Sequence, residues 1–219
     1  NLILLDDAFQ HRYVKPKVNI VLVDYNRPPH NDRLLPLGTL REPFRHILKA
    51  DIVIVTKCPY DISPLDMKLS SKNLDLYPSQ KLYFSRIEYA YPKPVFPISQ
   101  VLLENLSFLG PNDLILGLTG IANQRPFVKY LRSFNAQVKV IHYDDHHDYT
   151  REDFKYIIKI FNELQGAQKF IVTTEKDAVR ILNNPYFPLA MRSYSYFIPI
   201  RVTMSASEDD LIHVLETKI

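Results

Sequence analysis

The sequence predicts an α/β protein with a mostly parallel sheet. Apolar runs rich in β-branched residues alternate with helix-like patterns along the 219-residue chain. Continuous apolar runs of this kind are typical of strands buried on both faces, and alternation with helices is typical of parallel sheets. With 46% hydrophobic and 23% charged residues, the chain fits one large domain or two small ones and excludes disordered and fibrous classes.

The expected elements follow from these patterns in chain order. Seven apolar runs are predicted strands, namely 2–5, 18–23, 52–56, 114–118, 137–141, 170–174 and 196–200. Six stretches are predicted helices, namely 40–49, 64–69, 126–134, 151–164, 176–182 and 207–215. The helix over 151–164 has the clearest signals, because Thr150 is a good N-cap and acidic Glu152 and Asp153 lie in its first turn. The run at 2–5 opens the chain without a methionine or lead-in, which predicts a piece of a longer protein.

The pattern changes between Lys81 and Ile98, where an aromatic, extended stretch is followed by three prolines. Proline cannot donate a hydrogen bond to a strand ladder, so this stretch is not expected in the centre of a sheet. We therefore predict two small α/β units, 1–80 and 99–219, joined by an extended strand linker over 81–98.

Composition excludes several classes of protein and site. A net charge of +3 is too small to predict binding to nucleic acid, although it permits an anionic ligand or a membrane surface. No apolar run approaches the roughly 20 residues that cross a bilayer. The single cysteine, Cys58, excludes an intrachain disulfide and a cysteine-based zinc site. The five glycines form neither a P-loop nor a dinucleotide motif.

Two carboxylates, Asp6 and Asp7, follow the first predicted strand. Ligands of parallel sheets bind beyond the carboxyl ends of strands, where such a pair can hold Mg²⁺ against nucleotide phosphates, as in a Walker B motif. The alternative interpretation is that both residues only end the strand and cap the next turn.

A second candidate segment lies after the strand over 18–23. Its Pro- and Gly-containing turn leads to Arg41 and Glu42, and Arg33 and Arg45 lie close by. A guanidinium can bind a phosphate through two parallel hydrogen bonds, so the segment predicts a site for an anionic substrate. An ordinary surface ion pair is the alternative.

Two further clusters follow predicted strands in the second half. Residues 142–149 contain three histidines and three carboxylates within seven positions, which suits metal binding or acid-base chemistry, although a solvated polar loop is the alternative. Thr174 and Lys176 open the helix over 176–182, where amide groups and an ammonium can bind an anion. Thr174 with Asp177 also makes a plausible helix cap.

Five motifs in this order resemble the tetraacyldisaccharide 4′-kinase (lipid A 4′-kinase) family. They are Asp6-Asp7-Ala8-Phe9-Gln10-His11, Leu34-Leu35-Pro36 with Leu40-Arg41-Glu42-Pro43, Gly120-Ile121-Ala122-Asn123, Asp145-His146 and Thr174-Glu175-Lys176-Asp177. The resemblance implies P-loop-kinase-like three-layer units and an ATP- and Mg²⁺-dependent transferase of Gram-negative bacteria. That enzyme phosphorylates the 4′-hydroxyl of a lipid A disaccharide precursor, tetraacyldisaccharide 1-phosphate, at the cytoplasmic face of the inner membrane.

The resemblance also implies roles for individual residues. Asp6 and Asp7 correspond to the family's Mg²⁺-binding pair, with Asp7 also catalytic. Arg41 and Glu42 correspond to its active-site pair, and His146 corresponds to the histidine that supports its catalytic aspartate. Predicted substrate-binding residues are Gln10, His11, Arg33 and Arg45, and predicted cofactor-binding residues are Thr174 and Lys176.

The catalytic aspartate and the P-loop belong to a part of the family sequence that precedes Asn1, so the chain alone is expected to be soluble and inactive. Units 1–80 and 99–219 then correspond to an incomplete kinase core and a C-terminal domain. Two positions depart from the family pattern, which commonly has Gly at Ala8 and Pro at Gln124.

Two other functions remain open from the residues. Asp145-His146-His147 matches the signature of metal-dependent phosphoesterases, although the glycine-rich substrate motif of that class is absent from the sequence. A non-catalytic remnant or partner-binding module is the third interpretation.

Overall fold

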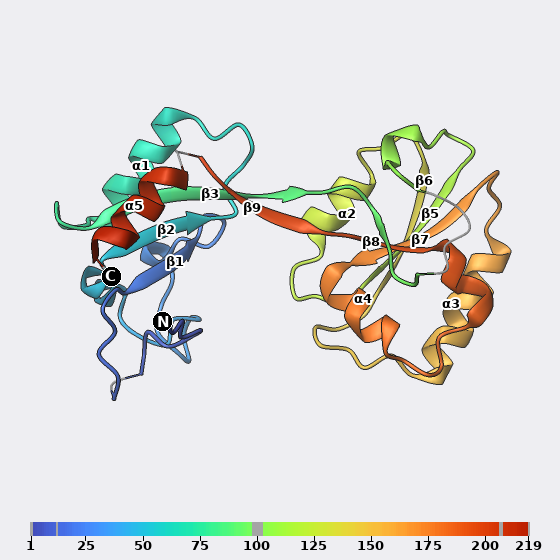
Figure 1. Ribbon diagram of the computed structural model, residues 1–219, viewed down its shortest axis with the longest axis horizontal. Coiled ribbons are helices and arrows are strands. Elements are labelled where there is room, and N and C mark those ends of the chain that lie inside the picture. Colours follow the sequence, from blue (N-terminus) through green and yellow to red (C-terminus); the bar gives the residue numbers. More distant parts are fainter. Residues whose placement is uncertain (1, 12, 98–102, 206–207, 219) are drawn as a thin grey trace. The chain divides into compact units, whose positions relative to one another are not determined.

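A computed structural model describes residues 2–11, 13–97, 103–205 and 208–218. The chain divides into two compact units, unit 1 with Asn1–Glu88 and Val202–Ile219, and unit 2 with Tyr89–Arg201 (Figure 1). Each unit is built on its own sheet. The predicted α/β class with mostly parallel sheets is confirmed.

Unit 1 contains a four-stranded sheet in the order β1-β2-β3-β9. Its strands are β1 (Ile20–Asp24), β2 (Ile52–Thr56), β3 (Lys81–Tyr89) and β9 (Ile200–Met204). The first three are parallel. Ser205 N donates to Phe84 O at 2.8 Å and Ala90 N donates to Pro199 O at 2.9 Å, so β9 runs antiparallel to β3.

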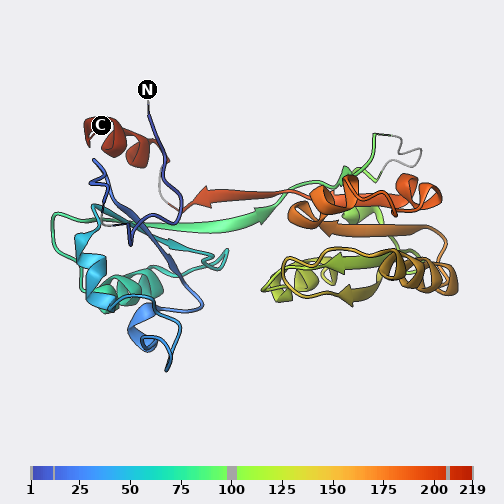
Figure 2. The same cartoon turned by 90° about the horizontal axis from the view of Figure 1, so that it is seen from below.

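Helices lie on both faces of this sheet (Figure 2). They are two 3₁₀-helices, Pro29–Asn31 and Phe44–Lys49, and two α-helices, α1 (Pro64–Leu74) and α5 (Glu208–Lys218). The core of unit 1 joins Leu74 of α1 and Ile47 to buried Val53 and Val55 of β2. Beside the opposite face, the Tyr83 hydroxyl donates to Asp210 of α5 at 2.8 Å.

Unit 2 contains a five-stranded sheet in the order β4-β8-β7-β5-β6. Its strands are β4 (Lys93–Pro94), β5 (Leu114–Thr119), β6 (Gln137–His142), β7 (Lys169–Thr174) and β8 (Ser195–Ile198). All pairs are parallel except β4 with β8. β4, which contains Pro94, lies at an edge of this sheet. At an edge, the missing amide hydrogen of a proline does not interrupt the hydrogen bonds between central strands.

Helices cover both faces of the second sheet and make three layers. They are α2 (Arg125–Leu131), α3 (Arg151–Glu163) and α4 (Glu175–Leu182), with two 3₁₀-helices, Leu106–Phe108 and Leu189–Tyr194. One core cluster contains Phe127 and Leu131 of α2, and the other contains Phe154 of α3 and Ile181 of α4. Every residue of β5 is buried, as expected for a central parallel strand.

Most predicted elements are present, but two expectations are wrong. Residues 2–5 form no strand, and Leu4 is 85% exposed. An apolar run becomes a buried strand only when neighbouring strands and helices cover it, and no described strand pairs with this one. The helix expected over 40–49 is shorter, a 3₁₀-helix over Phe44–Lys49. It begins only after Pro43, because the residue before a proline is disfavoured in the helical conformation.

The division of the chain also differs from the expected 1–80 and 99–219. The linker over 81–98 contains β3 and β4, which belong to different sheets. The last segment, Val202–Ile219, returns to unit 1. It is attached there by the pairing of β9 with β3 and by an ion pair of 3.1 Å between Lys218 and Asp51.

Candidate active-site clusters

An ion pair joins two of the predicted motifs in unit 1. Arg41 Nη1 lies 3.0 Å from Asp7 Oδ2, and both side chains are exposed. The two residues are 34 positions apart, so the turn after β1 brings the Arg-Glu motif to the Asp-Asp motif. Exposed ion pairs contribute little stability, so the pairing matters mainly for where it places the two charges.

The Asp6-Asp7 pair has the donor chemistry of a magnesium site. Asp6 Oδ1 accepts a hydrogen bond of 2.9 Å from Asp7 N, and Asp7 has a left-handed backbone with φ 47°, which aspartate tolerates better than most residues. Mg²⁺ is usually bound by one or two carboxylates, with water and phosphate oxygens completing the shell. Two adjacent carboxylates fit that pattern, although the described residues contain no group of three or more potential metal ligands.

The left-handed residue is Asp7 rather than Ala8. The replacement of the family's glycine by Ala8 is therefore compatible with the backbone at this turn. Gln10 and His11 follow on the same turn, where His11 N donates to Ala8 O at 2.9 Å, and both side chains are exposed.

Hydrogen bonds to Asp32 organise the turn that carries Arg33. The carboxylate accepts from the backbone N of Arg33 at 2.7 Å and of Thr39 at 3.0 Å, and also from the Thr39 hydroxyl. These hydrogen bonds lower the pKa of Asp32, with the largest effect from Thr39 and a smaller one from Arg33. Gly38 fits here because a Cβ would lie 2.2 Å from Arg33 O.

The remaining predicted residues of this segment have different environments. Glu42 is half-buried, and its Oε2 lies 2.5 Å from His46 Nδ1 one helical turn later. Arg33 and Arg45 are exposed, and neither guanidinium forms an ion pair within the described part of the chain. Both remain available to an anionic ligand.

In unit 2, His146 lies among cationic side chains at the carboxyl ends of β6 and β7. Lys176 Nζ lies 3.3 Å from His146 Nε2, and Arg180 Nη2 lies 3.2 Å from His146 Nδ1. Asp145 joins the same group, because Lys176 Nζ donates to its Oδ1 at 3.1 Å. The hydrogen bond from Lys176 lowers the pKa of Asp145.

A buried carboxylate, Asp177, anchors this cluster, and its central role was not predicted from the sequence. Its side chain is fully buried and accepts from Gly120 N at 2.9 Å, from the Thr174 hydroxyl at 2.8 Å and from Arg180 Nη1 at 3.1 Å. Arg180 also donates to Gly120 O at 3.2 Å. The only sequence signal was the spacing of Thr174 and Asp177, which identified the cap but not its contact with Gly120.

The capping interpretation of Thr174 is confirmed. Asp177 N donates to Thr174 Oγ1 at 3.2 Å at the start of α4. The Thr174 hydroxyl therefore donates to the Asp177 carboxylate and accepts from the Asp177 backbone N. Thr174 is 9% exposed. Lys176 is exposed on the same turn, and cofactor binding by either residue stays a prediction.

Asp145 and His146 lie close together, with Oδ2 and Nε2 3.6 Å apart, but His147 has other partners, so the three side chains do not converge as a metal site requires. His147 Nε2 lies 2.9 Å from Asp153 Oδ2, and its ring stacks on Tyr143 with centroids 4.5 Å apart. His146 instead has a left-handed backbone with φ 62° and contacts Arg180 and Lys176. This divergence weighs against the metal-dependent phosphoesterase interpretation.

Each unit has a mostly parallel sheet with charged groups at the ends of its strands. The chain is therefore an α/β protein, and its fold is the P-loop kinase fold. A solved structure described as the "apo" form of LpxK from Aquifex aeolicus in complex with ATP has the same fold. Its TM-score is 0.60 at 20% identity, over 97% of this chain and 56% of that one. The model of the tetraacyldisaccharide-1-P 4′-kinase family (LpxK) matches residues 1–219, and the chain belongs to that family.

Curated relatives with the name tetraacyldisaccharide 4′-kinase support this membership. The one from Bacteroides thetaiotaomicron is 42% identical over 95% of this chain and 56% of its own length. Those from Phocaeicola vulgatus and Cytophaga hutchinsonii are 41% and 32% identical, over 97% and 100% of this chain and 57% and 59% of their own lengths. The chain therefore spans little more than half the length of these relatives.

The described part of the chain offers no helix long and apolar enough to cross a membrane. The longest helix among the described residues, α3, has 13 residues, well short of the roughly 20 that a bilayer requires.

Proposed function

We propose that this chain is part of a tetraacyldisaccharide 4′-kinase. The complete protein transfers a phosphoryl group from ATP to the 4′-hydroxyl of tetraacyldisaccharide 1-phosphate, a lipid A precursor. The single observation that carries the proposal is the family match along residues 1–219. The contact between Arg41 and Asp7 adds geometric support, because it joins two of the five motifs that the family resemblance rests on.

Phosphoryl transfer depends mainly on positioning and on neutralising negative charge, and the chain's own residues suit both tasks. In unit 1, Arg41 supplies a guanidinium held by Asp7, with Arg33 and Arg45 exposed near it in sequence. Glu42 holds His46 in place at 2.5 Å. Gln10 and His11 offer hydrogen-bonding groups on the turn after Asp7.

Asp6 and Asp7 are the residues of this chain that would hold Mg²⁺, in keeping with their two adjacent carboxylates. The ion would neutralise charge on the phosphate oxygens of ATP. The solved LpxK that shares the fold is described as a complex with ATP, which supports ATP as the phosphoryl donor.

His146 is proposed to tune the basicity and position of the catalytic carboxylate of the complete enzyme. Its exposed imidazole is oriented by Arg180, which suits a group that acts on another side chain. Lys176 is proposed to bind a phosphate of ATP. Because the proposed substrate is a lipid, we propose that the complete enzyme acts at a membrane surface, the cytoplasmic face of the inner membrane.

The experiment uses the full-length protein, ATP with radiolabelled γ-phosphate and tetraacyldisaccharide 1-phosphate. Asp7→Ala should remove most transfer with little loss of stability, because an exposed carboxylate at an active site contributes mainly to transition-state charge. Asp61→Ala is the matched control, since Asp61 is an exposed carboxylate of unit 1. Equal activity of the two variants, with a lower melting temperature for Asp7→Ala alone, would contradict the proposed role.

A further inference from the structure

A pocket in unit 2 lies outside the clusters around Asp7 and His146. It has a volume of about 750 Å³ and opens between α2 and the end of β6. Its polar lining consists of Gln124, Arg125, Lys129, Arg132, Ser133 and His142. The pocket therefore contains three cationic side chains and no carboxylate.

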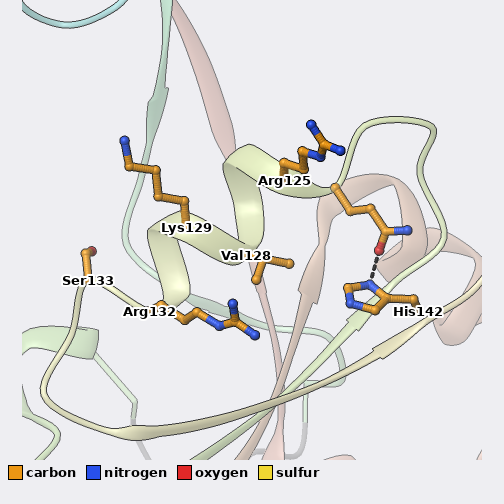
Figure 3. Close-up of a pocket in the computed structure, with 7 residues that line it drawn as sticks. Arg125, Val128, Lys129, Arg132, Ser133 and His142 are labelled. Carbon is orange, nitrogen blue, oxygen red and sulfur yellow. Dashed lines mark hydrogen bonds between the residues drawn. The ribbon is translucent and has the colours of Figure 1, made fainter.

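Arg125 and Lys129 lie on α2, and Arg132 is the residue that caps its C-terminal end (Figure 3). Arg125, Lys129 and Arg132 have the spacing i, i+4 and i+7, which places them on one side of a helix. All three are exposed. None forms an ion pair with a described residue, whereas Lys155 and Lys159 of α3 both pair with glutamates of their own helix.

The other wall of the pocket is held in place. His142 ends β6, and its Nδ1 contacts Oε1 of Gln124, the residue that precedes α2 (Figure 3). This contact ties the end of the strand to the start of the helix. Val128, which also lines the pocket, is buried.

The position in the fold is also one where ligands bind. β5 and β6 are parallel, and the pocket lies where β6 ends and where the connection from β5 enters α2. Parallel α/β sheets bind ligands beyond the carboxyl ends of their strands. Of the three cations, Arg125 lies at that edge, because α2 runs from the carboxyl end of β5 back toward the start of β6. Together with Lys129 and Arg132, which have no ion-pair partner among the described residues, it leaves a positive field along the helix that an anion can neutralise.

We propose that this pocket binds the phosphate group of an anionic ligand, with Arg125, Lys129 and Arg132 as the cationic groups. Arg125 and Arg132 can each donate two parallel hydrogen bonds to phosphate oxygens, and Lys129 adds a point charge. The site is distinct from the clusters around Asp7 and His146. A phosphorylated lipid headgroup and a free phosphate share this chemistry, so the experiment distinguishes them.

The test uses the ¹⁵N-labelled 219-residue chain and two probes. The first is inorganic phosphate in solution. The second is vesicles of phosphatidylcholine with phosphatidic acid, compared with vesicles of phosphatidylcholine alone. We expect amide shifts centred on residues 124–133 and 142, and binding that weakens as salt is added, because exposed charges are screened.

A triple variant, Arg125→Gln, Lys129→Gln and Arg132→Gln, should weaken binding about tenfold or more, at about two- to fivefold per cation. The matched control is Arg151→Gln, Lys155→Gln and Lys159→Gln on α3, which removes the same charge from another helix and should leave binding unchanged. The single variant Arg125→Gln, expected to lose about two- to fivefold, gives the answer if the triple variant fails to fold.

Each outcome decides the proposal. Binding of inorganic phosphate at this pocket supports a soluble phosphorylated ligand, and binding only to phosphatidic acid vesicles supports a lipid headgroup. Shifts centred on His146 and Lys176, equal weakening by both triple variants, or no binding to either probe would overturn it.

Discussion

The Nη2 atom of Arg180 lies 3.2 Å from Nδ1 of His146. A guanidinium has no acceptor, so this contact is a hydrogen bond only if Nδ1 carries the lone pair. In the neutral ring the hydrogen then belongs on Nε2, which lies 3.6 Å from Asp145 Oδ2. The Lys176 ammonium, 3.3 Å from Nε2, then forms no hydrogen bond with the ring and donates to Asp145 instead. Arg180 itself is held by the buried carboxylate of Asp177, so α4 fixes the orientation of the histidine.

The first prediction concerns the tautomer of His146. Arg180 and Lys176 are both donors, and a neutral imidazole has a single acceptor nitrogen, so only one of them can donate to it. Arg180 lies closer, at 3.2 Å against 3.3 Å, and Lys176 already donates to Asp145 at 3.1 Å. Neutral His146 should therefore carry its hydrogen on Nε2. Nitrogen chemical shifts of the imidazole, measured under alkaline conditions in which the ring is neutral, report the tautomer directly. Arg180→Met should give a mixture of tautomers, and Arg151→Met on α3 should change nothing. A ring protonated at Nδ1 in the unmodified chain would refute this arrangement.

The second prediction concerns the buried carboxylate. Asp177→Ala should lower the free energy of unfolding by about 3 kcal/mol, because it leaves Gly120 N and part of the Arg180 guanidinium without their partner. Urea denaturation followed by circular dichroism measures the loss. Glu175→Ala, an exposed residue of the same helical turn, should cost less than about 1 kcal/mol. Similar losses for both variants would mean that the Asp177 network is not a stabilising anchor.

The third prediction concerns the pH dependence of the Lys176–Asp145 contact. Lys176 lowers the pKa of Asp145 below its ordinary value of 3.8. The contact therefore contributes stability above pH 3.8, and that contribution is lost as the pH falls through the lower pKa of the folded state. An NMR titration of the Asp145 carboxyl should show a lowered pKa that rises toward 3.8 in Lys176→Gln.

Lys155→Gln is the control for that titration, because Lys155 pairs with Glu152 on α3 and not with Asp145. If the pKa of Asp145 is the same with and without Lys176, the contact does not persist in solution.

The fourth prediction separates His146 from His147 in the full-length protein. His146→Ala should lower kcat about 10²-fold, the low end of general acid-base contributions, with a smaller effect on KM and a changed pH-rate profile. His147→Ala should lower stability rather than kcat, because His147 bonds Asp153 and stacks on Tyr143. His213→Ala is a control on the exposed surface of α5. A larger kcat effect for His147 than for His146 would reverse the assignment.

The sequence was most informative where one pattern decides the structure. The strand over 52–56 is β2 to the residue, because both of its faces are buried and the apolar pattern has no competing interpretation. The helix over 151–164 follows from its capping residues, and the structure shows the full capping box of Thr150 and Asp153. These signals are local, so no information from the rest of the fold was needed.

The sequence was least informative where distant segments meet. The run at 2–5 has the pattern of a buried strand but lacks a pairing strand among the described residues. The contacts of Asp177 with Gly120, and of Arg41 with Asp7, join residues 57 and 34 positions apart. Only the arrangement of strands in the sheet and the path of the turns bring such residues together, and neither can be read from local spacing.

The most direct test of the proposed function is the identity of the reaction product. The full-length protein should move radiolabelled γ-phosphate from ATP to tetraacyldisaccharide 1-phosphate, and mass spectrometry with NMR should place one new phosphate on the 4′-oxygen. The 219-residue chain alone should transfer none, because its five glycines form no phosphate loop. Label on a different hydroxyl, ATP hydrolysis without labelled lipid, or transfer by the 219-residue chain alone would contradict the account.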